Sequence, residues 1–123
     1  AHLRAVVDLL ESHGVVPVLA TYPTLGDEGN LERHRLLVAH QRSWNVTVSG
    51  PGLVRIARTL NDVIRRVAAE RGLALADAEA AVPRDVAHFA DYVHYTDAGA
   101  ERVAACVAEA LARARLLGPE AAP

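Results

Sequence analysis

The side chains best suited to chemistry lie in the segment 91–99, which reads Asp-Tyr-Val-His-Tyr-Thr-Asp-Ala-Gly. Asp91 precedes His94 by three residues, and this spacing lets a loop carboxylate fold back onto one ring nitrogen of the imidazole. Such a contact fixes the tautomer and stabilises the imidazolium, which leaves the second nitrogen as a general base. The pair therefore predicts a histidine base that activates a nucleophile.

The same spacing occurs a second time, six residues earlier, at Asp85 and His88. For either copy alone, a solvated pair of loop side chains is the simpler interpretation. The later copy continues into Thr96, a predicted helix N-cap, and Gly99, in the first turn of an Ala- and Val-rich helix. We therefore expect the later copy to be the functional one.

Apolar periodicity predicts the elements that position this loop. Three segments show helical spacing, residues 1–13, 53–71 and 97–116. In the middle one, Ile56 and Leu60 belong to the apolar stripe, whereas Asn61 and Arg65 lie on the opposite, solvated face. Two apolar runs, 15–20 and 73–77, predict short buried parallel strands.

This alternation of helices and strands predicts an α/β fold with three layers, α/β/α, around a parallel sheet. Two strands would leave sheet edges and faces uncovered, so we expect residues 1–123 to form the C-terminal part of one larger domain. Residues 25–52 are expected to be a long, lid-like excursion that includes a helix over 31–44 and a Ser-Gly-Pro-Gly breaker at 49–52. Residues 78–95 are a predicted loop, and 117–123 a frayed tail.

Tyr22 follows the carboxyl end of the first predicted strand, the end at which α/β proteins place their sites. It is a candidate for contact with a substrate, and local packing of a loop aromatic is an equal alternative. Trp44, in the excursion, could anchor a lid or tether the loop. Asp77 ends the second strand and is expected to hydrogen-bond the loop that follows.

The segment around His94 resembles the last motif of the SGNH (GDSL-type) hydrolases. In that family an Asp-x-x-His is followed by Thr or Asn, by Gly and by an amphipathic helix. Asp91, His94, Thr96 and Gly99 stand in the same register. The resemblance extends upstream to the helical Asn61, to the short strand that ends at 77 and to the Thr-x-Pro of 21–23; it is weakest over 25–52.

The resemblance implies a flavodoxin-like SGNH hydrolase fold and hydrolysis of a small ester or acyl substrate without a cofactor. By resemblance, His94 takes the proton of a nucleophilic serine and Asp91 orients His94. The chain lacks the family's Gly-Asp-Ser and Gly-x-Asn-Asp motifs, and none of its serines stands in a strand-to-helix turn: Ser12, Ser43 and Ser49. We therefore expect a missing N-terminal half or a partner chain to supply the nucleophile, and this chain alone to be inactive.

Composition narrows the other possibilities. Thirteen basic against fifteen acidic residues give a net charge of −2, which argues against a nucleic-acid partner. No apolar run approaches the roughly 20 residues of a membrane span. Cys106 is the only cysteine, and the histidine spacings predict no metal site. The alternative to a hydrolase is a non-catalytic, flavodoxin-like binding or partner-pairing module in which Asp-x-x-His is incidental.

Overall fold

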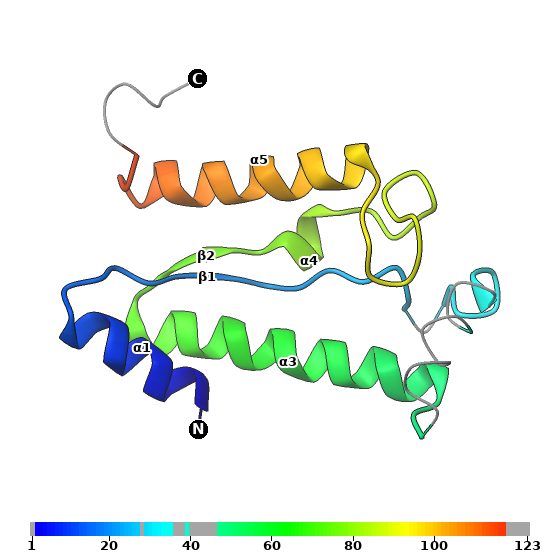
Figure 1. Ribbon diagram of the computed structural model, residues 1–123, viewed down its shortest axis with the longest axis horizontal. Helices are drawn as coiled ribbons and strands as arrows, with labels where there is room; N and C mark the ends of the chain where they lie inside the picture. The colour runs from blue at the N-terminus through cyan, green and yellow to red at the C-terminus, as the bar shows by residue number, and fades with distance from the viewer. Residues whose placement is uncertain (1, 28, 36–38, 40–46, 118–123) are drawn as a thin grey trace.

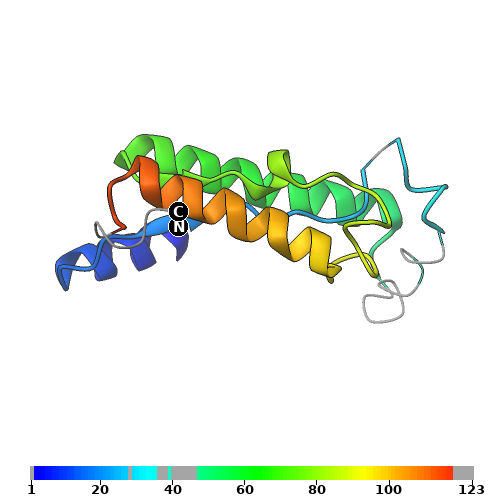
Figure 2. The same cartoon turned by 90° about the horizontal axis from the view of Figure 1, so that it is seen from above.

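The computed structural model describes residues 2–27, 29–35, 39 and 47–117. Its elements follow one another as α1 (His2–Ser12), β1 (Val18–Ala20), α3 (Gly50–Arg71), β2 (Ala74–Ala76), α4 (Ala78–Ala81) and α5 (Asp97–Arg113). The two strands pair in parallel, with Val18 opposite Ala74 and Ala20 opposite Ala76. Figure 1 shows α5 on one side of the strand pair and α1 with α3 on the other. In Figure 2 the loops that follow β1 and α4 lie together at one end of α5.

The prediction of a three-layer α/β/α fold is wrong, because two short strands do not form the parallel sheet that its middle layer requires. The protein is mostly helical, and the part that the structure describes contains two strands of three residues each. Both apolar runs are longer than the paired stretches. Pro17 has no N–H to donate at the start of the first run. Leu73 donates its N–H to the Ala68 carbonyl at 2.9 Å, so it belongs to the C-terminal cap of α3 rather than to a strand.

The helix ends follow local capping chemistry. The Ser-Gly-Pro-Gly segment at 49–52 is the start of α3, not a breaker. Ser49 Oγ accepts the Gly52 N–H at 3.2 Å, and proline fits the first turn because no intrahelical donor is needed there. Gly72 ends the helix at φ 63°. The predicted N-cap Thr96 is confirmed, and residues 78–81, predicted as loop, form α4.

The buried face of α3 also differs from the prediction. Asn61, placed on the solvated face by the sequence pattern, is fully buried, together with Val54, Val67 and Ala68. Ile56 and Leu60, placed in the buried stripe, are about half exposed. The buried side of α3 therefore contains both polar and apolar side chains, and an apolar stripe that includes Ile56 and Leu60 is exposed to solvent.

Small side chains let α5 approach the strands closely. One buried cluster joins β2, α4 and α5 through Ala76, Ala78, Cys106 and Ala110. Burial raises the pKa of the Cys106 thiol. A second cluster packs Leu25 against Val82 and Phe89, which belong to the segment between α4 and α5. Among the helices that the structure describes, none combines the length and apolar character of a membrane span.

Candidate functional site

The loop before α5 is closed by backbone contacts of its own. Ala90 donates its N–H to the His94 carbonyl at 2.9 Å, and Phe89 and Tyr95 form an isolated antiparallel bridge. The rings of Phe89 and Tyr95 meet edge to face at 5.4 Å between centroids. Leu25 donates its N–H to the Tyr92 carbonyl at 3.0 Å, which ties the loop to the chain that leaves β1. His94 therefore projects from a braced loop.

The predicted contact between Asp91 and His94 is present. Asp91 Oδ2 lies 2.7 Å from His94 Nδ1. Asp91 Oδ1 accepts two backbone N–H groups, from Val93 at 2.9 Å and from His94 at 2.8 Å. The carboxylate is thus held by its own turn and faces the ring with its second oxygen. The exposed fraction is 25% for the Asp91 side chain and 76% for that of His94, so Nε2 is accessible from outside.

Asp85 and His88 form the same kind of turn with the opposite exposure. Asp85 Oδ1 lies 2.7 Å from His88 Nδ1 and also accepts the His88 N–H at 3.1 Å. Here the imidazole is 18% exposed and the carboxylate 50%. A general base must present its free nitrogen to a substrate. The first copy buries its imidazole, and the second copy displays it.

The environment of Asp91 favours its charged form. Partial burial opposes ionisation, but the N–H groups of His94 and Val93 and the His94 ring outweigh it. Together they lower the pKa of Asp91 to about 2. The carboxylate is therefore ionised at neutral pH, as a group that orients an imidazole and stabilises its positive form must be.

Tyr22, two residues beyond β1, is half exposed. Burial raises the pKa of the Tyr22 phenol, and the negative charge of Asp91 raises it further. Burial also raises the pKa of Tyr92 and Tyr95, and Tyr22 adds to both shifts. Tyr22 thus interacts electrostatically with Asp91, Tyr92 and Tyr95. Of the three residues that the sequence nominated, the structure brings Asp91 and His94 into contact, and Tyr22 interacts electrostatically with Asp91.

The loop joins α5 through a very close backbone approach. The Thr96 N–H bonds to the His88 carbonyl at 3.1 Å, and Thr96 Oγ accepts the Gly99 N–H at 3.2 Å. A Cβ placed on Gly99 would lie 2.0 Å from the His88 carbonyl oxygen. Only glycine fits there, so the first turn of α5 and the loop that carries His94 are fixed against each other.

An ion-pair network, which the sequence analysis did not predict, links the carboxyl end of β2 to α3 and α4. Arg65 binds Asp77 through two nitrogens, at 2.9 and 2.7 Å, and reaches Glu79 at 2.7 Å. Glu79 also binds Arg84 at 2.7 Å, and Thr21 donates its hydroxyl to Asp77 at 2.8 Å. The Arg65 guanidinium holds the pKa of Asp77 below its ordinary range, against the effect of burial. Arg65 is therefore a structural ion-pair residue, not the solvated one that helix periodicity predicted.

Two of the three serines in the sequence lie in the described part of the chain. Ser12 donates its hydroxyl to the Leu9 carbonyl at 2.7 Å, and Ser49 caps α3. Ser43 and Trp44 lie outside the described residues, as does most of the helix predicted over 31–44. Within the described part of the chain, no three His, Cys, Asp or Glu side chains are grouped as metal ligands would be.

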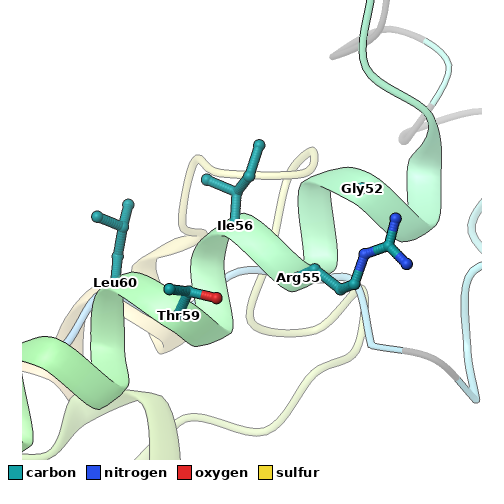
Figure 3. Close-up of a pocket in the computed structure, with 5 residues that line it drawn as sticks. All are labelled: Gly52, Arg55, Ile56, Thr59 and Leu60. Atoms are coloured by element: carbon teal, nitrogen blue, oxygen red, sulfur yellow. The ribbon is translucent and has the colours of Figure 1, made fainter.

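The outer face of α3 carries a shallow surface hollow. Its lining residues follow helical spacing, Gly52, Arg55, Ile56, Thr59 and Leu60. Figure 3 shows Ile56 and Leu60 projecting side by side from one face of the helix, with Arg55 and Thr59 next to them. The hollow is lined by one helix and holds no carboxylate or imidazole, so it offers contact surface rather than catalytic groups.

Comparison with known proteins identifies no relative of the chain. The chain matches no protein-family model, and comparisons with curated proteins and with solved structures find no significant match. The functional interpretation therefore depends on the side chains around His94.

Proposed function

We propose that the chain supplies the histidine base and its orienting aspartate to a serine ester or acyl hydrolase of the SGNH type. One observation carries the proposal. His94 is largely exposed, while Asp91, shielded and ionised, lies 2.7 Å from its Nδ1. A catalytic imidazole needs this arrangement, with one nitrogen held and the other free.

In the proposed reaction, Nε2 of His94 takes the proton of a serine hydroxyl as the serine oxygen attacks the carbonyl carbon of the substrate. Asp91 stabilises the imidazolium that results. When the tetrahedral intermediate collapses, His94 returns the proton to the oxygen of the departing alcohol. Water then attacks the acyl group by the same route and releases the acid. In this proposal Tyr22, whose phenol interacts electrostatically with Asp91, contacts the substrate, and the reaction requires no cofactor.

The serine and the oxyanion hole of this proposal come from a further polypeptide segment, either an N-terminal half of the domain or a partner chain. Two features support a missing neighbour. The hydroxyls of Ser12 and Ser49 are engaged at helix ends. Large apolar side chains are also exposed, among them Val15 and Val16 before β1 and Ile56 and Leu60 on α3. Burial of such side chains against a neighbour is favourable by about 25 cal/mol per Å² of apolar surface.

The test is the hydrolysis of a short-chain p-nitrophenyl ester by the assembled protein. His94→Ala should lower kcat/KM by about a thousandfold or more, because the proton acceptor is lost. His88→Ala is the matched control, since it removes the same side chain from the other Asp-x-x-His turn, and we expect it to retain most of the activity. Equal turnover in wild type and His94→Ala would refute the proposal.

A non-catalytic partner-pairing module is the second candidate. The observation in its favour is the turn at Asp85 and His88, which forms the same carboxylate–imidazole contact with a mostly buried ring. The Asp-x-x-His turn is therefore stable without any catalytic demand on it. If the assembled protein binds its neighbour but hydrolyses no ester, this candidate replaces the first.

A further inference from the structure

Asn61 stands out among the residues that the site has not yet used. It is a fully buried amide in the middle of α3, and both ends of the amide bind the backbone of one residue. Asn61 Oδ1 accepts the Tyr22 N–H at 2.7 Å, and Asn61 Nδ2 donates to the Tyr22 carbonyl at 2.9 Å. A polar group without solvent is costly unless it is paired, and here the pairing is reciprocal.

The position of this contact explains why it is needed. The parallel pairing ends where Thr21 donates its N–H to the Ala76 carbonyl at 3.0 Å. Successive residues of an extended chain direct their N–H and C=O to opposite sides, so those of the next residue, Tyr22, point away from β2. Among the residues that the structure describes, no strand pairs with β1 on that side. The amide of Asn61 offers one acceptor and one donor, like a peptide group, and takes the place of a neighbouring strand.

The clamped segment leads directly to the candidate site. The Tyr95 hydroxyl donates to the carbonyl of the next residue, Pro23, at 3.5 Å, and the Tyr22 phenol interacts electrostatically with Asp91. Tyr95 is the chain neighbour of His94. The segment 22–23 thus lies between the buried amide of α3 and the loop that carries the histidine.

We propose that Asn61 is a positioning residue that holds Tyr22 beside the Asp91–His94 pair by clamping its backbone. The consequence for catalysis rests on the proposed ester hydrolysis. The clamp itself is a property of this chain, and it can be tested without any turnover.

The test uses Asn61→Asp and NMR spectra of the labelled chain. A neutral carboxyl group reproduces the amide, because its O–H donates to the Tyr22 carbonyl and its C=O accepts the Tyr22 N–H. An ionised one places a negative oxygen against that carbonyl. Burial raises the pKa of such a carboxyl group, so the variant is compared above and below the pH at which the introduced group titrates. We expect the amide and ring signals of Tyr22 to move away from their wild-type positions above that pH and to return below it. Leu60→Ala, on the exposed face of the same helix, should leave them in place.

A second experiment asks whether Asn61 acts on His94 through the ring of Tyr22 or through a general effect on the fold. Tyr22→Ala keeps the backbone that Asn61 binds and removes only the ring. With its carboxyl group ionised, Asn61→Asp should shift the His94 ring signals in the wild-type background, and this shift should be lost in the Tyr22→Ala background at the same pH. An equal shift in both backgrounds would overturn the proposal, because Asn61 would then act on His94 without Tyr22.

Two further outcomes also decide the matter. If Asn61→Asp does not fold, Tyr22→Ala alone should still displace the His94 ring signals, and Leu60→Ala should not. Unchanged His94 signals in Tyr22→Ala would refute the proposal. If the NMR results are as expected but the assembled protein hydrolyses no ester, the clamp stands and only the proposed function fails.

Discussion

Gly99→Ala tests whether the loop that carries His94 is fixed by its contact with α5. Gly99 is the third residue of its helix, and its N–H binds the hydroxyl of the N-cap Thr96. Alanine at such a position normally stabilises a helix, by up to about 1 kcal/mol relative to glycine. Here the added methyl group would lie 2.0 Å from the His88 carbonyl oxygen, well inside contact distance.

The magnitude follows from what must move. The His88 carbonyl also accepts the Thr96 N–H, so it cannot rotate away without losing a hydrogen bond worth about 1 kcal/mol. Forcing a methyl group into a packed site costs typically 1–3 kcal/mol, and here the obstacle is backbone. The clash outweighs the helix preference. We expect Gly99→Ala to lower the free energy of unfolding by about 2 kcal/mol or more.

Gly52→Ala is the matched control. Gly52 occupies the same position of α3, and its N–H binds the N-cap hydroxyl of Ser49. A Cβ there would meet side-chain atoms, Val48 Cγ1 at 3.0 Å and Ser49 Oγ at 3.2 Å, which can yield by a few tenths of an ångström. We expect a change within about 1 kcal/mol. Urea unfolding followed by circular dichroism compares the two variants, and a Gly99→Ala protein as stable as wild type would refute the reasoning.

Further predictions concern the carboxylates and imidazoles of the site. Asp91→Asn should lower the free energy of unfolding at pH 6 by about 1–2 kcal/mol, since the pKa of Asp91 lies at about 2 rather than 3.8. This deficit should shrink as pH falls from 3.8 toward 2, where the wild-type carboxylate takes up a proton. A deficit unchanged at pH 2 in urea titrations would contradict the assignment. Arg65→Met should cost about 2 kcal/mol, because it weakens the pairing of a mostly buried carboxylate, whereas Arg4→Met, in an exposed ion pair, should cost under about 1 kcal/mol. His94→Ala should change thermal stability less than His88→Ala, since the His88 ring is largely buried; the reverse order would contradict the structural role given to His88.

Local sequence patterns predicted the helices and the contact between Asp91 and His94 better than the sheet. A cap such as Thr96 and a turn such as Asp91 to His94 depend on neighbours within three residues, and both are present. The strands depend on partners far along the chain. Apolar runs at 15–20 and 73–77 are consistent with a larger sheet, and the structure pairs only three residues of each.

The face of α3 shows why the remaining details were out of reach. Periodicity identified an apolar stripe through Ile56 and Leu60, but the buried side of the helix includes Val54 and Asn61. An asparagine in a buried stripe has no signature in composition, because its role depends on the backbone of Tyr22, 39 positions away. The sequence does contain one signal that Asn61 shares the buried face of α3. Asn61 stands seven residues from both Val54 and Ala68, at the spacing of a single helix face.

Cys106, packed between α5 and the strands, gives this chain a reporter of its own. The thiol is buried and its pKa is raised, so a thiol reagent reacts slowly while α5 stays in place. Because the sequence holds no second cysteine, the rate of labelling measures how often α5 separates from β2, without any engineered site. A neighbour that docks on the chain and stabilises this packing would slow the labelling, and the same measurement would then report binding.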